Sequence, residues 1–350
     1  MTILVFLAVL VVLILVHELG HFVTAKASKV TVEEFGLGFP PRLMGLKRGE
    51  TIYSLNAIPL GGFVKMAGEV DPQVPGSLAS KSIATRVLVL GSGSLMNAFL
   101  PILLFSLALM IPHSVVVGQV SVKAVVPDSP AARAGMMPGE TVLEINGQPV
   151  HNIGTLQRLT HLNLGREMTI LLQDTSQKTR EVTVIPWWKP PPGQGAVGIQ
   201  LEQLSATVVS ESLPFWKAIP AGAVQGVETF ALFKNEVITW FVRESAPQVA
   251  GPVGIAQLTG EVAKAGISPL LEFAGFLSIN LAIINIFPLP ALDGGRIAFV
   301  MLEWLRRGKR VSPRVESVIH MVGFALLMAL AVLITYQDIL RIIRGDSLIP

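Results

Sequence analysis

Runs of apolar residues, each long enough to cross a bilayer as a helix, constrain this chain more than any other feature. About 20 helical residues span the ~30 Å hydrocarbon core of a membrane. Only 15% of the residues are charged and 51% are hydrophobic, whereas about 25% of the residues in a soluble domain are charged. We therefore predict a polytopic α-helical membrane protein with about four transmembrane helices. They extend from Thr2 to about Lys26, from about Ala84 to Pro112, from about Leu270 to Pro288 and from about Val318 to Tyr336.

The charges between these runs predict how the chain crosses the membrane. The formal net charge of +3 would suit a nucleic-acid-binding protein, but Lys and Arg flank the apolar runs and form no dense stripe. Nucleic acid is therefore excluded as a partner. Lys and Arg are concentrated in residues 28–84 and 295–317, and short basic loops face the cytoplasm. Both termini and the long segment between the second and third runs are then predicted to be extracytoplasmic.

The first apolar run contains two histidines and a glutamate in the pattern HExxH. His17 and His21 lie four residues apart on one face of a helix, so both imidazoles can bind the same ion. Glu18 lies beside them and can take a proton from a metal-bound water. Ionisable residues at membrane depth indicate a functional site, although two histidines satisfied by helix packing are an alternative. A cleaved signal peptide is disfavoured because no Lys or Arg precedes the run.

A catalytic zinc site commonly uses three protein ligands, so the two histidines need a third. The chain has no cysteine, which leaves His, Asp or Glu. The third run ends in NLAIINIFPLPALDGG, where two prolines and two glycines break the helix at membrane depth. We assign Asp293, at this break, as the third ligand; an N-cap of the next helix is the alternative. Asn280 and Asn285 either donate to an oxyanion and orient substrate or hydrogen-bond between helices.

These motifs resemble the site-2 protease family, and the overall plan resembles the bacterial regulator-of-sigma-E proteases. HExxH in the first span and NxxPxPxLDGG in a later span carry the resemblance, which covers essentially the whole chain. The family's chemistry is zinc-dependent peptide hydrolysis inside the membrane. By this resemblance the Zn²⁺ ligands are His17, His21 and Asp293, the catalytic base is Glu18, and Asn280 and Asn285 assist the substrate or the transition state.

Further segments resemble other parts of that family. Arg86 and Asn97 match its second-span segment, except that Ser94 stands where a proline is expected. Residues 250–255 also match a recurring segment. The Gly- and Pro-rich strands between the first two runs resemble a membrane-associated β-hairpin region, whose exposed edge would hold a substrate in an extended form. A plain structural hairpin is the alternative. The substrate-binding candidates in this region are Gly61, Gly62 and Phe63.

The long segment between the second and third runs differs in character from the rest. It has charges of both signs, period-2 apolar runs at 168–172 and 181–185, and a turn signal at Asn146-Gly147. These features predict a small β-rich domain, and residues 127–147 resemble part of a PDZ domain, which is circularly permuted in this family. Gly198 and Ile199 would then belong to its carboxylate-binding loop. Such a domain either captures a C-terminus or acts as a size filter.

The predicted organisation has four parts. Residues 1–112 hold the first two transmembrane helices, HExxH and the cytoplasmic-side β-hairpin loop. Residues 113–202 form an inserted extracytoplasmic PDZ domain of α+β fold. Residues 203–268 form an amphipathic or interfacial helical connector, and residues 269–350 hold the last two transmembrane helices with NxxPxPxLDGG.

Together these features predict a zinc-dependent intramembrane endopeptidase that performs regulated intramembrane proteolysis. By the resemblance, its partners are the lipid bilayer and single-span membrane proteins already cut by another protease, such as anti-sigma factors or remnant signal peptides, in a bacterial inner membrane. A non-catalytic PDZ scaffold with a structural metal is one alternative, but it would need a fourth protein ligand. A metal transporter is another, but it would carry polar residues in several spans.

Overall fold

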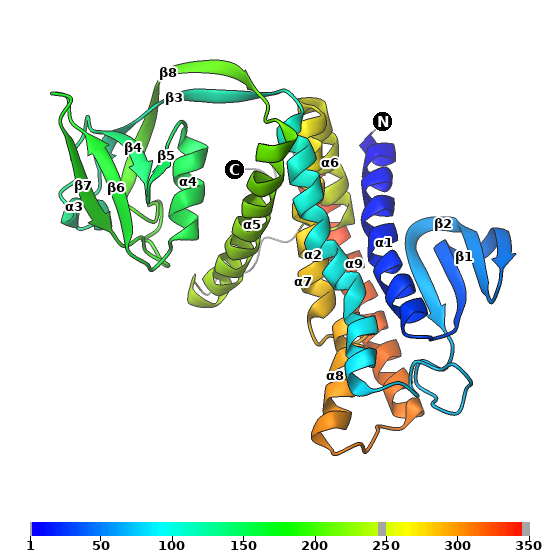
Figure 1. Ribbon diagram of the computed structural model, residues 1–350. Coiled ribbons are helices and arrows are strands. Elements are labelled where there is room, and N and C mark those ends of the chain that lie inside the picture. Colours follow the sequence, from blue (N-terminus) through cyan, green and yellow to red (C-terminus); the bar gives the residue numbers. More distant parts are fainter. Residues whose placement is uncertain (1, 244–249, 345–350) are drawn as a thin grey trace. The chain divides into compact units, whose positions relative to one another are not determined.

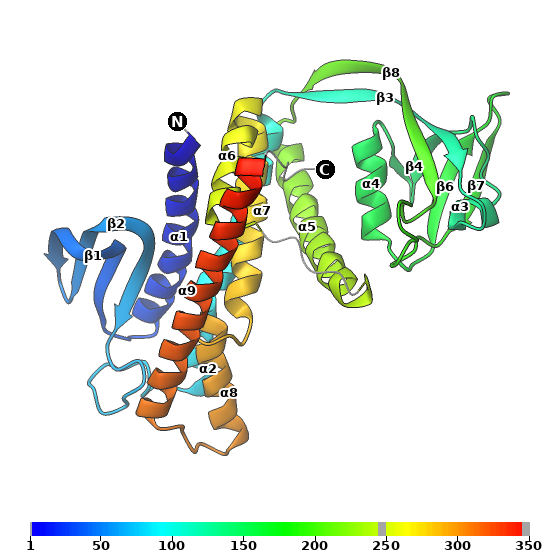
Figure 2. The same cartoon turned by 180° about the vertical axis from the view of Figure 1, so that it is seen from behind.

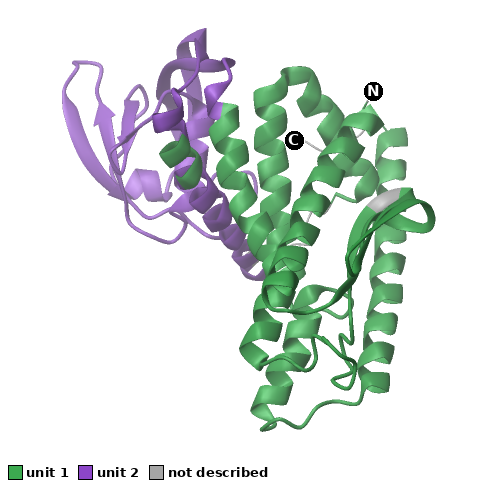
Figure 3. Ribbon diagram, turned by 45° about the vertical axis from the view of Figure 1, so that its right-hand side comes forward, with its two compact units in different colours: residues 1–108, 219–223, 249–350 green, residues 109–218, 224–248 purple. Residues whose placement is uncertain are grey.

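The chain forms two compact units in the computed structural model, which describes residues 2–243 and 250–344 (Figure 3). One unit comprises residues 1–108, 219–223 and 249–350, and the other comprises residues 109–218 and 224–248. The ends of the predicted first and last parts, residues 1 and 345–350, lie outside the described residues. So do residues 244–249 of the predicted connector.

Helices long and apolar enough to cross a membrane dominate the first unit (Figure 1). Within the described residues there are four, and they coincide with the four apolar runs, which confirms that prediction. The last helix is longer than predicted because it continues past its apolar stretch into polar turns at both ends (Figure 2). The four are α1 (Thr2–Ala27), α2 (Ile83–Met110), α7 (Ile267–Ile286) and α9 (Pro313–Arg344). Two shorter helices, α6 (Pro252–Ala265) and α8 (Asp293–Leu305), belong to the same unit.

Small residues bring α1 and α2 into backbone contact. A Cβ added at Gly20 would lie 2.5 Å from the carbonyl oxygen of Ser92, and the hydroxyls of Thr24 and Ser92 are 2.8 Å apart. Membrane helices approach closely where they present small residues and share hydrogen bonds. This contact places the HExxH turn of α1 directly against α2.

The predicted strands between the first two spans form an antiparallel hairpin, β1 (Val32–Arg48) and β2 (Thr51–Met66). Its base is buried: Val32, Val64 and Met66 pack with Ala25 of α1 and Val89 of α2. Repeated register shifts along the pair bend the ribbon, as β-bulges do. The far end of β1 is exposed. The hairpin is therefore attached to α1 at its base.

Residues 250–255, which match the recurring family segment, contain the start of α6. The N-cap residue of this helix is Gly251, which has no side chain to cap it. The carboxylate of Asp338, on α9, replaces that cap by accepting a 2.8 Å hydrogen bond from the backbone N–H of Gly254. Asp338 is only 1% exposed, and Arg341 also donates to it at 3.0 Å. Helix N-termini favour such negative charge, so this contact links α6 to α9.

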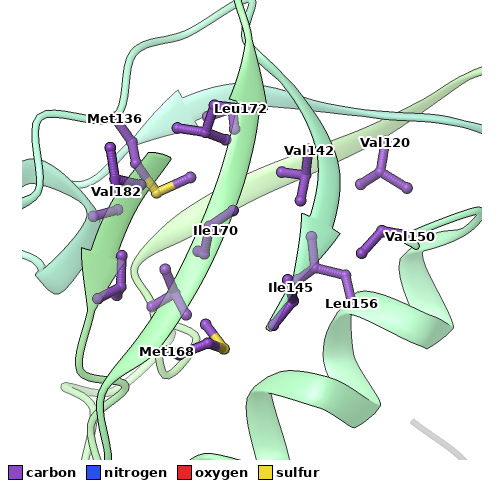
Figure 4. Close-up of a cluster of buried hydrophobic side chains, with 14 of the residues drawn as sticks. Val120, Met136, Val142, Ile145, Val150, Leu156, Met168, Ile170, Leu172 and Val182 are labelled. Atoms are coloured by element: carbon purple, nitrogen blue, oxygen red, sulfur yellow. The ribbon is translucent and has the colours of Figure 1, made fainter. Parts of the chain in front are cut away.

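The second unit is built on a β-sheet with strand order β7-β6-β4-β3-β8, and β5 pairs with β4. Its buried core lies between this sheet and helix α4, where Val142, Ile145 and Ile170 face Leu156 (Figure 4). The strands are β3 (His113–Val125), β4 (Thr141–Ile145), β5 (Gln148–Pro149), β6 (Met168–Gln173), β7 (Thr179–Val184) and β8 (Ile199–Glu211). The helices are α3 (Pro130–Arg133), α4 (Ile153–Leu162) and most of α5 (Phe215–Arg243).

Strand β8 is where the structure differs from the predicted organisation. Residues after 202 were expected to be helical, but β8 continues to Glu211, which pairs with His113 at the start of β3. Most of this extension is exposed, and pairing with β3 holds it as a strand. Helix α5 follows, and the side chain of Asn235 donates a 2.7 Å hydrogen bond to the carbonyl of His161 at the end of α4.

A buried ionic cluster joins α2 to α8 in the first unit. Arg86, at the start of α2, donates a 2.6 Å hydrogen bond to Glu303 of α8, and Arg310 donates to the same carboxylate at 3.0 Å. Burial alone would raise the pKa of Glu303, but hydrogen bonds from the two guanidinium groups outweigh it and hold the pKa below its usual value. These residues lie far apart in the sequence, and no motif predicted that they meet.

Replacing Glu303 with Gln should destabilise the protein, because both guanidinium groups lose their anion. A buried pair broken on one side loses about 3 kcal/mol or more of unfolding free energy. A depressed carboxyl pKa stabilises the fold above the unfolded value of ~4.3, and this contribution is lost as pH falls through the folded pKa. Thermal unfolding in detergent should therefore show a lower melting temperature for Glu303→Gln at pH 7, and the difference between the two proteins should shrink as the pH falls through the lowered folded pKa.

Glu33→Gln provides the matched control. Glu33 pairs with Lys65 at 2.8 Å, but these side chains are 43% and 63% exposed. Exposed pairs contribute ~1 kcal/mol or less, so this variant should melt close to the wild type. Equal melting of Glu303→Gln and wild type at pH 7 would contradict the stabilising role of the cluster.

Candidate active site

Two histidines of α1 and the first residue of α8 converge on one point. His17 Nε2 and His21 Nε2 lie 3.0 and 3.2 Å from Asp293 Oδ2, and the two imidazole nitrogens are 3.2 Å apart. Among the described residues these three form a group whose ligand atoms all lie within 4.8 Å of one another. The helical spacing of four residues and the break before Asp293 therefore bring together the set predicted from the sequence.

The hydrogen bonds of His21 orient it for metal binding. Its Nδ1 lies 2.8 Å from the carbonyl oxygen of Val89, an acceptor, so Nδ1 carries the proton and donates. In a neutral imidazole this leaves the Nε2 lone pair free, and Nε2 is the atom that points at Asp293. A second hydrogen bond of this kind fixes the tautomer and ring orientation of histidine ligands.

Asn97 of α2 can fix the orientation of His17 in the same way, through a hydrogen bond to its Nδ1. Its side-chain amide lies 3.4 Å from His17 Nδ1, and its Oδ1 is buried without a partner among the described residues. An amide can present either its oxygen or its nitrogen to a neighbour. With the oxygen facing the ring, Asn97 accepts a hydrogen bond from Nδ1, and the His17 Nε2 lone pair also turns toward Asp293. The donor set thus fits a divalent metal.

Gly93 leaves the space that this arrangement needs. A Cβ at this position of α2 would lie 2.4 Å from His21 Nε2 and 2.6 Å from His17 Nε2. Any side chain would therefore occupy the point where the two lone pairs converge. Gly93 was not among the predicted site residues; its signal in the sequence is the cluster of small residues at 91–94 inside an apolar helix, which marks a close approach.

The break between α7 and α8 presents Asp293. Helix α7 ends at Ile286, and Leu292 is the N-cap of α8, so Asp293 is not the cap that the alternative interpretation required. Gly294 is essential to the break, since a Cβ there would lie 2.1 Å from the carbonyl oxygen of Phe287. The chain can fold back over the carbonyl of Phe287 only because Gly294 lacks a side chain.

Glu18 lies in a cavity beside the three convergent residues. This cavity has a volume of about 250 Å³ and is also lined by Asn285 and by Gly61 and Gly62 of β2. Gly62 approaches Glu18 closely, because a Cβ there would be 3.0 Å from Glu18 Cγ. One cavity therefore contains the Glu18 carboxylate, the candidate metal centre and a part of β2 that has no side chains at positions 61 and 62.

Several predicted residues lie elsewhere. Asn280 does not line this cavity: its amide donates a 3.0 Å hydrogen bond to the carbonyl of Phe276, one turn earlier in α7. The ring of Phe63 lies over Gly36, whose Cβ would be 2.4 Å from it. In the second unit, Gly198 has φ +78° and accepts a 2.9 Å hydrogen bond from Val126 N–H. Ile199 pairs with Val125 in the sheet.

Comparisons with known proteins identify the family of this chain. The chain is 34% identical over 331 residues to a protein of Clostridium acetobutylicum that is named as a zinc metalloprotease, covering 94% of each chain. It is 36% identical over 335 residues to a protein of the same designation from Clostridium perfringens, covering 94% of this chain and 95% of the other. Zinc metalloprotease RasP of Oceanobacillus iheyensis is 28% identical over 430 residues, covering 97% and 99% of the two chains.

The family model described as peptidase family M50 matches residues 5–330. This match includes every residue of the metal-ligand geometry, Glu18, Asn97 and the α7–α8 break, and the chain therefore belongs to peptidase family M50, the family of the site-2 proteases.

Proposed function

We propose that this metalloprotease cleaves single-span membrane proteins within the bilayer and that zinc is its metal. One observation carries the proposal: His17 and His21, on a helix long and apolar enough to cross a membrane, meet Asp293 with ligand atoms within 4.8 Å. The relatives named as zinc metalloproteases support the choice of metal. Membership of this family supports membrane proteins as substrates and the bilayer as the surroundings.

His17, His21 and Asp293 would hold the zinc, which when bound supplies a Lewis acid that polarises the scissile carbonyl and acidifies the attacking water. Glu18 lines the same cavity and acts as general base. It takes a proton from that water and returns it to the leaving amine. Asn285, on the cavity wall, donates a hydrogen bond to the substrate carbonyl as negative charge develops there. Asn280 is bonded to its own helix, so we assign it no contact with substrate.

The wall formed by β2 is proposed to receive the substrate. A helical substrate hides its amide groups, so it must be extended before its peptide bond can be reached. Gly61 and Gly62 line the cavity beside Glu18, which lets a peptide backbone lie against the base without meeting side chains. Phe63, packed over Gly36, anchors this strand within the hairpin.

We further propose that residues 113–202 form the core of a PDZ domain, with β3 and β8 as its extended arm. The six-stranded sheet and the edge position of β8 support this proposal. Gly198 and Ile199, at the start of β8, would line the site where an extended C-terminus adds to the sheet, or the domain would exclude large ectodomains. We also propose that the protein lies in a bacterial inner membrane with this domain and both termini outside the cytoplasm; the basic short loops support this orientation. The substrates would be proteins that another protease has already shortened.

The metal site itself favours catalysis over the alternatives. Within the described part of the chain, the group that could hold a metal comprises His17, His21 and Asp293. A closed structural site has four protein ligands, whereas a catalytic site keeps one position open. This argues against a scaffold with a structural metal. Uptake of zinc into vesicles without any peptide cleavage would instead favour a transporter.

Glu18→Gln and His21→Ala should separate proton transfer from metal binding. Glutamine cannot act as a base, so Glu18→Gln should retain zinc but lose about 10²–10⁴-fold in cleavage rate. His21→Ala removes a ligand and should lose both zinc and cleavage. The measurements are zinc content of the purified protein and cleavage of a single-span model substrate in reconstituted bilayers.

His151→Ala is the control, because His151 lies in the second unit, outside the metal-ligand group. It should keep both zinc and activity. Full cleavage by Glu18→Gln would contradict the role of the base. Undiminished zinc in His21→Ala would contradict the ligand set.

Gly93→Ala should abolish metal binding without removing any ligand. The added methyl group would lie 2.4–2.6 Å from both Nε2 atoms and would occupy the metal position. Gly91→Ala, two residues earlier in the same helix, is a matched control, since its Cβ meets only Ile297 Cδ1 at 3.7 Å. Elemental analysis should show zinc in the Gly91 variant and little in the Gly93 variant; equal zinc in both would sink the proposed metal position.

A further inference from the structure

Helix α9 holds the loop that presents Asp293. The backbone N–H of Ala291 donates a 2.8 Å hydrogen bond to Nδ1 of His320. One turn further along α9, a Cβ added at Gly323 would lie 2.2 Å from Pro290 Cβ, so α9 and the loop are in direct contact there. His320 and Gly323 are three residues apart and therefore lie on one face of the helix. This face holds two consecutive residues of the loop.

The loop needs such support because its backbone makes few bonds of its own. Ala291 has φ +74°, a left-handed conformation that residues with a Cβ adopt only when their surroundings hold them there. The preceding residue, Pro290, has no N–H to donate. Within the loop, Leu289 N–H donates to Phe287 and Leu292 N–H donates to Leu289. The N–H of Ala291 is satisfied by α9.

The supported residues belong to the wall of the active site. Ala291 and Leu292 line the cavity that contains His17, Glu18 and Asp293. Asp293 follows two residues after the bond to α9. A shift of Ala291 would therefore move both the cavity wall and the carboxylate.

His320 is held in the orientation that this bond requires. To accept from Ala291, Nδ1 must carry a lone pair, so in the neutral ring the proton is on Nε2. The ring packs on Phe299 of α8, with centroids 5.5 Å apart. His320 also lines a separate cavity of about 300 Å³ with Arg86, Arg296 and Glu316. The ring is thus positioned by α8 and α9 together.

We propose that His320 is a positioning residue for the metal centre, that Gly323 gives Pro290 the space to dock, and that together they set Asp293 against His17 and His21. The inference rests on the proposed function to the extent that Asp293 is a metal ligand. Metal affinity and coordination are measurable without substrate, so the positioning role can be tested apart from proteolysis.

The test compares His320→Leu with His320→Asn in the full-length protein, using Co²⁺ as a spectroscopic probe. Leucine keeps an apolar contact with Phe299 but cannot accept the bond from Ala291. Asparagine places an acceptor oxygen near the position of Nδ1. We expect His320→Leu to bind Co²⁺ about tenfold more weakly, as the loss of one buried hydrogen bond implies, with a changed visible spectrum. It should also have a lower kcat at unchanged KM for a single-span substrate. His320→Asn should recover most of the affinity, spectrum and kcat.

Two matched variants complete the design. Ser317→Ala alters the same cavity as His320 without touching the loop, and it should match the wild type. Gly323→Ala pushes α9 away from Pro290 and should weaken Co²⁺ binding, whereas Gly91→Ala, whose Cβ has room, should not. Gly323→Ala keeps the proposal testable if His320→Leu does not fold.

Each of the following outcomes decides whether His320 positions the metal centre. A His320→Leu variant with wild-type Co²⁺ affinity and spectrum overturns the inference and leaves the proposed function standing. Equal impairment of His320→Leu and His320→Asn also overturns it, because the ring would then serve only to fill space. A wild-type protein that binds no Co²⁺ and cleaves no substrate overturns the proposed function, and the positioning role fails with it.

Discussion

Ionisable groups at membrane depth must find their partners within the protein, and this constraint organises the first unit. His17 and His21 find their partners on two other helices: Asn97 and the carbonyl of Val89 on α2, and Asp293 at the start of α8. Each contact depends on a helix being close enough to reach the imidazoles. The glycines at 20 and 93 allow α2 to come that close. The histidines can therefore reach their partners only because α1 and α2 pack tightly.

The parts of the fold that follow a simple period were predictable. Apolar runs of helical length gave the four candidate spans, and the four-residue spacing of the histidines placed them on one face. The broken helix before Asp293 was predictable because Pro removes a backbone donor and Gly readily adopts conformations outside the helix. In each of these cases the signal lies within one contiguous segment, where local physics dominates.

The remaining features depend on contacts between distant segments and left little trace in the sequence. Asn280 and Asn285 looked equivalent, but they differ by five residues and so point to different sides of α7; only Asn285 reaches the cavity. His320 had no partner at ligand spacing, because its partner is a backbone N–H in another element. The extension of β8 to Glu211 is exposed, and its strand conformation comes from pairing with β3. Gly93 matters because it has no side chain, which leaves space beside the two imidazoles.

The glycine wall beside Glu18 has a consequence for selectivity. A surface of Gly61 and Gly62 offers peptide backbone and no side chains to whatever enters the cavity. Contacts of that kind discriminate poorly between side chains, but they discriminate strongly between an extended strand and a helix, whose own amides are already paired. If substrate enters along this wall, as proposed, the wall recognises the readiness of a segment to unwind, and a transmembrane sequence rich in helix-weakening residues would be favoured whatever its exact order.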